Sequence, residues 1–399
     1  MSSSKPSLYF ISTEVPWPAT SGGRIKTFRF LKFLSNHYDV RLVCAYGSNQ
    51  EATLTALRKA SGIISVQVFG EQKPRTLLNW FMAIMQFPTF NCFRVYSKKM
   101  ESIIQWGIEQ SDITIVDHLE MLEMIPQRLI SKIVYHSHNA EFKLWSDFAE
   151  LEKNPLKKWF LEWEAERVRV FERWAIRNTK FTFAAPNDSA MIVDKSDLDP
   201  QKFRLTYHLG NEAYLTSPPI NLDENKPRVF FGGTLNWMPN LDGITWFMKT
   251  IWPDVKAAIP EAELVVCGSG ASKPLIDHFR RTKGVDYKGF VPDVEDVMKE
   301  CRCAIVPLRF GSGMKIKTLD ALYRGLPLLS TETGVEGIDL QNGIHAIVTS
   351  SENQWISSLT TLLKDPKAGS DMSLAGRSLV AAKYTYPLIF PQMLEALKQ

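Results

Sequence analysis

The chain has 399 residues, which at roughly 150 residues per domain predicts two or three compact domains. Hydrophobic residues make up 45% and charged residues 23%, so the sequence can form ordinary cores and is not that of a disordered chain. The chain has 47 Lys and Arg residues and 43 Asp and Glu residues, so its net charge is only +4. A concentrated basic surface that would bind duplex DNA is therefore not expected. We therefore predict no nucleic-acid partner.

The cysteines and the N-terminal residues indicate in which cellular compartment the protein is found. The five cysteines form no CxxC pair and no Cys/His zinc spacing, so we expect buried free thiols in a reducing environment and no metal site. The start of the chain lacks the long apolar region and cleavage site of a signal peptide, and no run approaches about 18 uninterrupted apolar residues. These patterns predict a soluble, cytoplasmic protein.

Short apolar runs alternate with helical segments in the first half of the chain. Their continuous apolarity favours strands that are buried on both faces of a parallel sheet. A helix is expected over residues 23–37, where apolar side chains recur at helical spacing. The predicted strands cover residues 8–13, 39–46, 65–69, 113–119, 132–138, 180–186 and 204–210.

The composition changes after Gly210. Residues 211–228 carry adjacent prolines and few periodic apolar positions, which predicts an interdomain linker. Two strand–helix series around this joint predict two doubly wound domains, in which ligands bind beyond the carboxyl ends of the strands. The second series has predicted strands at residues 228–234, 263–270, 285–291, 303–309, 326–332 and 345–351.

The clearest candidate site follows a predicted strand end, in the run PLRFGSGMKIKTLDALYRGLP (307–327). Gly311 and Gly313 let backbone N–H groups approach an anion without a Cβ in the way, and a helix predicted to begin near Lys315 adds its positive dipole end. A diphosphate needs such donors together with cations, because it carries several acceptor oxygens and more than one negative charge. Solvated lysines and a plain turn are the alternative. The charged candidates are the cations Arg309, Lys315 and Lys317 and, for a ribose diol, the carboxylate of Asp320.

A second group follows another strand, in FFGGTLNWMPNLDG (230–243). Gly232 and Gly233 close the strand and Thr234 follows them. This pattern fits a second backbone approach to the same ligand, and it fits a simple tight turn equally well. By contrast, GSGASK (268–273) holds Lys273 where a dinucleotide fingerprint needs its third glycine, so no NAD site is predicted there.

A histidine pair ends the strand predicted in KIVYHSHNAEF (132–142). His136 and His138 point to the same side of that strand if it continues straight. An imidazole can donate a hydrogen bond and stabilise charge at a reacting centre, whereas a structural histidine is the alternative for either residue. His118, at the end of the preceding strand, competes with them for a functional role.

The run VPLRFGSGMKIKTLDALYRGLPLLSTETGVEGI (306–338) resembles the retaining glycosyltransferases of family 4, the glycosyl transferases group 1, in the subgroup that reads PLR-x-G-x-G-x-x-x-K-x-L-E-A before G-x-P. The resemblance covers nearly the whole chain and is strongest from Arg228 to Gly337. It implies the α/β fold called GT-B, with two Rossmann-like doubly wound domains that face a central cleft. The implied domains are 1–210 and 228–380, joined by the linker 211–227 and followed by a crossover helix, 381–399, that returns to the first domain.

The resemblance also implies site residues and partners. His138 aligns with the family histidine near the donor sugar, Lys317 and Arg309 would contact the donor diphosphate, and Asp320 would hold the ribose. No cofactor is implied: a nucleotide-diphosphate sugar is the co-substrate, and a glycan or lipid-linked molecule is the acceptor, in surface polysaccharide or glycoconjugate biosynthesis. The implied donor-binding residues are Gly22, Gly23, Arg24, Gly233, Thr234, Arg309, Gly311, Ser312, Gly313, Lys315, Lys317 and Asp320.

The sequence departs from the family pattern at three points. Ser312 stands where the family has the first of two glutamates, and Asp320 replaces the second with a shorter side chain. The Arg and Lys that usually follow the first strand of the second domain are absent, which leaves charge neutralisation to the cations of 309–317. No DxD-like metal site is recognisable, so we expect neutralisation by cations and not by a metal. The donor sugar, the base and the acceptor stay open.

Two apolar stretches of the first domain allow more than one interpretation. Residues 75–99 are strongly apolar and end in basic residues, and residues 154–180 predict a long helix with aromatic side chains among charges. Either segment is suited to a peripheral contact with the inner face of a membrane. Alternatively, both cover the core or a partner, and the glutamates at 162, 164, 166 and 172 form a solvated helix face.

Other functions of the same fold stay open. An epimerase would need acid–base carboxylates at the sugar, which the sequence does not supply, and a phosphorylase would need a longer chain. The alternative from another class is a nucleotide-sugar-binding or scaffold protein whose catalysis has weakened, as Ser312 and Asp320 would allow.

Overall fold

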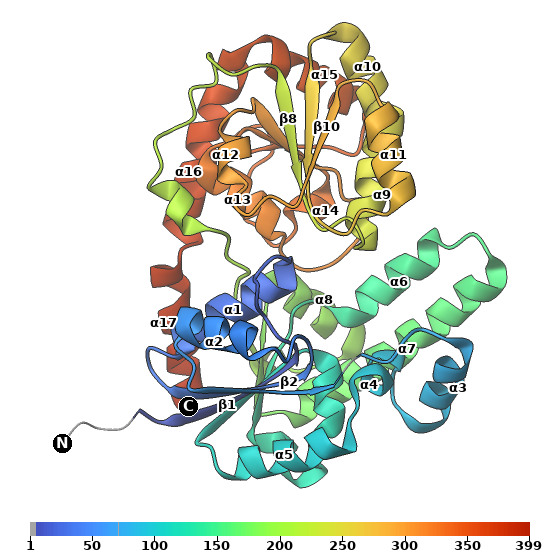
Figure 1. Ribbon diagram of the computed structural model, residues 1–399, viewed down its shortest axis with the longest axis vertical. Coiled ribbons are helices and arrows are strands. Elements are labelled where there is room, and N and C mark those ends of the chain that lie inside the picture. Colours follow the sequence, from blue (N-terminus) through green and yellow to red (C-terminus); the bar gives the residue numbers. More distant parts are fainter. Residues whose placement is uncertain (1–4, 71) are drawn as a thin grey trace. The chain divides into compact units, whose positions relative to one another are not determined.

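The computed structural model describes residues 5–70 and 72–399, and the chain forms two compact units (Figure 1). The first unit contains the chain up to Tyr207 together with Phe390–Gln399, and the second unit is His208–Ile389. Residues 211–227 belong to the second unit and include a short 3-10 turn, Glu212–Leu215. Each unit is built on its own parallel sheet.

The sheet of the first unit has the strand order β3-β2-β1-β4-β5-β6-β7, and all its neighbouring strands run parallel. The order reverses at β1, which pairs with β2 on one side and with β4 on the other. In open α/β sheets, ligands bind where the strand order reverses, beyond the carboxyl ends of these strands. The strands are β1 (Ser7–Glu14), β2 (Asp39–Tyr46), β3 (Ser65–Gly70), β4 (Ile113–Asp117), β5 (Ile133–His136), β6 (Phe181–Ala184) and β7 (Phe203–Leu205).

The sheet of the second unit repeats this plan in the order β10-β9-β8-β11-β12-β13. Its order reverses at β8, which pairs in parallel with β9 and with β11. The carboxyl ends of β8 and β11 therefore mark the ligand edge of this unit. The strands are β8 (Arg228–Gly232), β9 (Glu263–Cys267), β10 (Val285–Gly289), β11 (Cys303–Val306), β12 (Leu328–Ser330) and β13 (Ile347–Val348).

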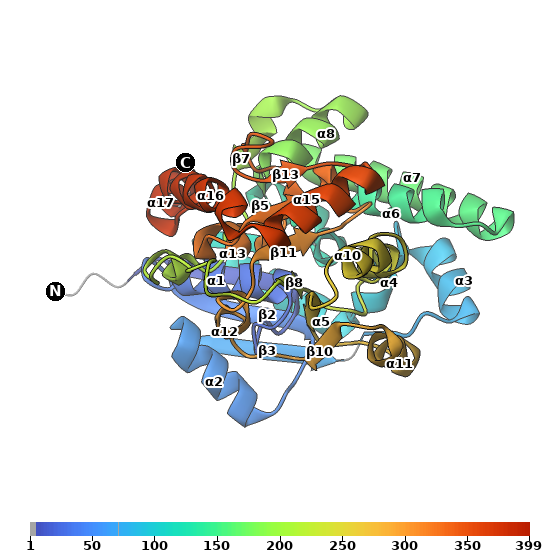
Figure 2. The same ribbon diagram turned by 90° about the horizontal axis from the view of Figure 1, so that it is seen from above.

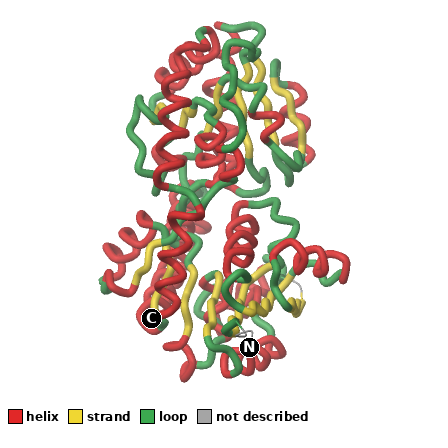
Figure 3. Tube along the Cα trace, turned by 90° about the vertical axis from the view of Figure 1, so that its left-hand side faces the viewer, coloured by secondary structure: helices red, strands yellow, loops and turns green. Residues whose placement is uncertain are grey.

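Helices lie on both sides of each sheet, as the tube view shows for each unit taken alone (Figure 3). The first unit contains α1 (Gly22–Leu34), α2 (Glu51–Ser61), α3 (Leu77–Gln86), α4 (Phe90–Val95), α5 (Lys98–Glu109), α6 (Glu141–Leu151), α7 (Pro155–Asn178) and α8 (Pro186–Ser196). The second contains α9 (Met238–Trp246), α10 (Trp252–Ala258), α11 (Lys273–Arg281), α12 (Glu295–Met298), α13 (Ile316–Arg324), α14 (Glu332–Val335), α15 (Glu352–Lys364) and α16 (Ser370–Lys383). The last helix, α17 (Tyr386–Lys398), begins in the second unit and ends in the first.

Each predicted strand is present, and the parallel arrangement predicted from continuous apolarity is confirmed. Six consecutive residues of β1, from Leu8 to Thr13, are buried. Such strands are covered on both faces, which is why they carry no alternation of polar and apolar residues. Several strands end two or three residues earlier than predicted, because the residues that follow them leave the sheet. All five cysteines are free and buried, as expected.

The expectation of a solvated acidic face on α7 is wrong at two of its glutamates. The Glu164 carboxylate is buried and accepts hydrogen bonds from the backbone N–H of Phe90 and from Arg167. Glu172 is also buried and accepts hydrogen bonds from the backbone N–H groups of Glu141 and Phe142, at the start of α6. These carboxylates satisfy unpaired N–H groups inside the fold, a function that a pattern of alternating charge does not reveal.

Candidate functional site

In the first unit, the edge where the strand order reverses carries a buried carboxylate surrounded by hydrogen-bond donors. Asp117, the last residue of β4, is completely buried. Its Oδ1 atom accepts hydrogen bonds from His136 Nδ1 at 2.6 Å and from His138 Nε2 at 2.7 Å. Its Oδ2 atom accepts hydrogen bonds from Thr27 Oγ1 at 2.7 Å and from Ser12 Oγ at 3.3 Å. A buried carboxylate with four donors is fixed in position and stays ionised.

Asp117 also sets the protonation of the two histidines on β5 and just beyond it. Burial lowers the pKa of His136 to about 4, with the Lys26 cation adding to this effect. Burial likewise lowers the pKa of His138 well below its usual value, although the Asp117 charge opposes the shift. Both imidazoles are therefore neutral at pH 7, and each holds its proton on the nitrogen that faces Asp117.

His118 differs from these two histidines in conformation and in charge. Its backbone has a φ of 88°, a conformation that costs a non-glycine residue of order 1–3 kcal/mol. Its ring stacks on that of His138 with 3.9 Å between centroids, and its Nδ1 lies 2.7 Å from the Asp117 backbone oxygen. Burial would lower the pKa of His118, but the Asp117 carboxylate outweighs this and raises the pKa to about 9. The side chain of His118 is 18% exposed, whereas that of His138 is 6% exposed.

Helix α1 brings a buried lysine to the same edge. The Lys26 ammonium donates a hydrogen bond to the Ser137 backbone oxygen at 3.0 Å, and burial lowers its pKa to about 7. At the start of this helix, a Cβ on Gly22 or Gly23 would meet no atom within 4 Å, so packing does not require these glycines. Arg24, which we expected to add charge for a ligand, instead pairs with Glu14 at 2.7 Å. We call Lys26, Asp117, His118, His136 and His138 the histidine–aspartate cluster.

Three members of this cluster have their ligand atoms within 4.8 Å of one another, close enough for a metal ion: Asp117, His136 and His138. Their mutual hydrogen bonds already use the atoms that would face such an ion. The Lys26 cation, which lowers the pKa of both imidazoles, adds a positive charge that a second cation would oppose. The arrangement therefore fits a hydrogen-bonded cluster better than a metal centre, and the absence of a metal stays a prediction.

In the second unit, the loop between β11 and α13 contains the glycine turn predicted from the sequence. Gly311 has a φ of 123° and Gly313 a φ of 79°, so both adopt conformations that other residues rarely reach. Every residue of the loop from Phe310 to Lys315 is buried. Helix α13 begins at Ile316, with Lys315 at the position before its first residue. The backbone N–H groups of this turn therefore lie at the N-terminal end of α13, in the segment that the sequence singled out.

Two lysines lie together at this turn. Lys317 donates from Nζ to Asn240 Oδ1 at 2.5 Å, and Lys315 donates to the Gly313 backbone oxygen and reaches Glu336 at 3.3 Å. Burial and the nearby Lys315 charge together lower the pKa of Lys317 to about 7. Gly233 makes room for this arrangement, because a Cβ there would lie 2.6 Å from Lys317 Nζ. An anion placed here would relieve the repulsion between the two cations.

Other predicted donor-binding residues are already engaged with neighbours. Arg309 is exposed and forms a two-point ion pair with Asp242 on α9. The Asp320 carboxylate accepts a hydrogen bond from the Asn211 backbone N–H at 2.5 Å. Thr234 contributes its backbone oxygen to Asn240 Nδ2, at 2.8 Å. The buried side chain of Ser312 completes the glycine turn between Gly311 and Gly313.

The sequence did not single out three residues of these arrangements: Asp117, Lys26 and Asn240. Asp117 stands 19 and 21 residues before its histidine partners, so no spacing motif connects them. Only the parallel pairing of β4 with β5, which places Asp117 opposite His136, brings them together. The available signal was the position of Asp117 at a strand end next to His118.

Comparison with known proteins agrees with this organisation. Residues 226–365 match the model of the family described as glycosyl transferases group 1. An uncharacterised 44.6 kDa protein in the cps region of Klebsiella pneumoniae is 20% identical over 394 residues, which cover 95% of this chain and 97% of that protein.

Solved structures extend the likeness to both units. HepE of Anabaena in complex with UDP-glucose is 12% identical, with a TM-score of 0.68, over 98% of this chain and 99% of that one. TarM of S. aureus, in complex with Fondaparinux, alpha-GlcNAc-glycerol and UDP, is 9% identical, with a TM-score of 0.69, over 98% of this chain and 100% of that one. The chain therefore has the two-domain GT-B fold, and residues 226–365 of its second unit are similar to the glycosyl transferases group 1.

Proposed function

We propose that the protein is a retaining glycosyltransferase that moves a sugar from a nucleotide-diphosphate donor to a glycan or lipid-linked acceptor. The observation that carries this proposal is the pair of lysines at the glycine turn of the second unit, where burial and Lys315 hold the pKa of Lys317 near 7. A diphosphate would place negative charge beside Lys317, since the Glu336 carboxylate reaches only Lys315. The group 1 domain and the UDP complexes of HepE and TarM support the same ligand class.

In the proposed mechanism, the second unit stabilises the leaving group. Cleavage of a glycosyl–phosphate bond builds negative charge on the diphosphate, and donors fixed where this charge develops lower the barrier by a few kcal/mol each. Lys315, Lys317 and the N–H groups of the glycine turn are those donors. Arg309 is the weaker candidate, because Asp242 already neutralises its charge. Asp320 would need to share its carboxylate between the ribose and the Asn211 N–H.

The first unit is proposed to orient the sugar and the acceptor. His138, the residue assigned to catalysis from the sequence, donates a hydrogen bond from Nε2 to Asp117, so its Nδ1 is an acceptor and not a donor. His118 carries the positive charge of the cluster and has the more exposed ring. We propose that His138 accepts a hydrogen bond from the substrates, that His118 stabilises developing negative charge, and that Asp117 positions both rings.

The experiment that tests the proposal is a screen of thermal stability with UDP, GDP and dTDP, followed by incubation with the corresponding nucleotide sugars. A ligand that binds the folded state raises the apparent stability, by about 2.7 kcal/mol at a hundred times its Kd. We expect one nucleotide to stabilise the protein and its sugar conjugate to be hydrolysed slowly without acceptor. An NMR assignment of the anomeric configuration of the product would decide retention. No stabilisation by any nucleotide would contradict the proposal.

A scaffold protein with weakened catalysis is the second candidate, favoured by the engagement of Asp320 with the backbone of Asn211. It predicts nucleotide binding without hydrolysis or transfer of any sugar. The context of the K. pneumoniae relative, a cps region, supports surface polysaccharide biosynthesis as the setting of either candidate.

A further inference from the structure

Helix α3 in the first unit presents an unusually apolar face to solvent. Of its ten residues, only Ala83 is buried. Leu77 is 90% exposed, Phe81 60% and Met85 67%, and these residues recur every four positions. Because that spacing follows the helix period, they form one continuous stripe, which Leu78 and Ile84 widen. We call these five side chains the α3 stripe.

The opposite face of α3 is firmly anchored, so this exposure is a property of an ordered helix. Trp80 stacks on Phe90 with 3.5 Å between ring centroids and contacts Phe160 of α7 edge-on at 4.7 Å. At the start of the helix, the Thr76 hydroxyl accepts a hydrogen bond from the Asn79 N–H. Figures 1 and 2 agree in placing α3 beside the α6–α7 pair, away from the strands of its unit.

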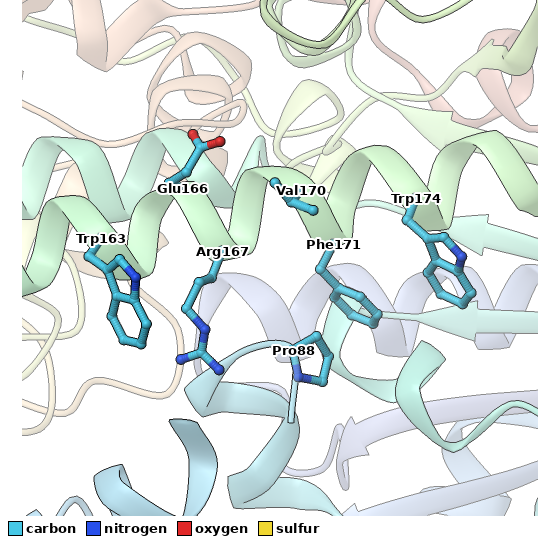
Figure 4. Close-up of a pocket in the computed structure, with 7 residues that line it drawn as sticks. All are labelled: Pro88, Trp163, Glu166, Arg167, Val170, Phe171 and Trp174. Atoms are coloured by element: carbon cyan, nitrogen blue, oxygen red, sulfur yellow. The ribbon is translucent and has the colours of Figure 1, made fainter. Parts of the chain in front are cut away.

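Helix α7 continues the apolar surface next to α3. Near its start, Leu156 and Trp159 are mostly exposed. Further along, Trp163, Phe171 and Trp174 line a hollow of about 380 Å³ between α7 and Pro88 (Figure 4). Exposed apolar patches of this extent on a soluble unit mark an interaction surface.

The chain segment that carries the α3 stripe is basic. Residues 72–100 contain five basic residues and no acidic residue. Arg75 is exposed directly before the helix, and Lys157 is exposed on α7 between Leu156 and Trp159. The acidic residues nearest in sequence to these two apolar side chains are Glu152, four residues before Leu156, and Glu162, three residues after Trp159. An apolar helix face flanked by Lys and Arg matches the acyl region and the anionic headgroups of a bilayer surface.

We propose that the α3 stripe docks the protein onto the surface of an anionic lipid bilayer, with Leu77, Phe81 and Met85 inserted among the acyl chains and Arg75 and Lys157 at the headgroups. A helix of ten residues is too short to cross a bilayer, and among the described helices none combines the length and apolarity that crossing requires. The docking is therefore peripheral. It does not depend on the donor chemistry proposed for the second unit.

The test is flotation of the full-length protein with vesicles made of equal parts phosphatidylglycerol and phosphatidylcholine, and with vesicles of phosphatidylcholine alone. We expect the wild-type protein to float with the anionic vesicles at low salt and less at high salt. The variant Leu77→Ser/Phe81→Ser/Met85→Ser should bind these vesicles at least about tenfold more weakly. Each substitution removes the favourable free energy of transferring an apolar side chain from water into the bilayer. Equal flotation of variant and wild type would overturn the proposal.

A matched control is Leu374→Ser/Leu388→Ser, which removes exposed leucines from the second unit and should float like the wild type. Light scattering after gel filtration tests the alternative occupant, a second copy of this chain. A wild-type dimer that the triple variant converts to a monomer, without vesicle binding by either, would also overturn the proposal. Thermal shift with the nucleotide should be the same for all three proteins, which separates this proposal from the one on the donor.

Discussion

The two strand-order reversals of the molecule carry opposite electrostatic arrangements. In the first unit, the buried Asp117 has four hydrogen-bond donors, and one imidazolium at His118 balances its charge. In the second unit, Lys315 and Lys317 repel one another, and the carboxylate of Glu336 reaches only Lys315. The first arrangement is complete without a ligand and fixes the orientation of its rings. The second would gain stability from an added anion, which is why we propose it as the site of the diphosphate.

The largest loss of activity should come from Asp117→Asn, which disrupts the histidine–aspartate cluster of the first unit. The amide keeps the shape but loses the charge that fixes both rings, so we expect kcat to fall by about a hundredfold or more, with an unchanged Kd for the nucleotide. The free energy of unfolding should fall by about 1–3 kcal/mol, as measured in urea. The control is Asp112→Asn, an exposed carboxylate that bonds Ser7 at the other end of β4. Activity equal to that of the control would contradict the positioning role.

In the lysine pair of the second unit, Lys317→Ala should lower kcat/KM by at least about a hundredfold, because a charge-assisted contact to the proposed leaving group is lost. The fold should be intact, since the substitution also removes a charge that its surroundings disfavour. Steady-state kinetics and circular dichroism measure the two effects. Lys273→Ala, at the exposed start of another helix in the same unit, is the control. Kinetics like those of the control would remove the phosphate assignment.

The lowered pKa of Lys317 predicts how folding stability and nucleotide binding depend on pH. Because its pKa is about 7 in the free folded protein, against about 10.4 in an unfolded chain, the unfolded state binds this proton more tightly. Lys317 therefore opposes folding most below pH 7, and this cost disappears as the pH rises through 10. A diphosphate requires the charged form, so nucleotide binding should take up a proton and weaken by up to about tenfold per pH unit above pH 7.

Calorimetric titrations in buffers of different ionisation enthalpy measure this proton uptake at pH 8. Lys317→Met should abolish it, since the variant lacks the ammonium whose pKa lies near 7. Proton uptake that persists in this variant would assign the effect to another group.

The smallest effect should come from Arg309→Ala. Because Asp242 already pairs with the exposed Arg309, we expect less than about a threefold change in the KM for the donor. The matched control is Arg280→Ala, another exposed arginine of the second unit. A loss as large as that of Lys317→Ala would show that Arg309 leaves Asp242 to bind the diphosphate.

Local patterns predicted the strands and the glycine turn, because a buried parallel strand and a left-handed glycine leave direct marks in the sequence. The turn at Gly311 and Gly313 precedes a helix from Ile316, as predicted. The pairing of Asp117 with His136 depends on the neighbouring strands β4 and β5, and the burial of Glu172 depends on the packing of α7 against α6. Such long-range contacts leave no spacing motif, so the sequence did not reveal them.

The most direct test of the central claim is a crystal structure of the protein soaked with the nucleotide that gives the largest thermal shift. We predict a diphosphate within hydrogen-bond distance of Lys317 Nζ and of the backbone N–H groups at Gly311–Gly313. A nucleotide bound elsewhere, with this turn empty, would contradict the claim that the lysine pair of the second unit holds the leaving group.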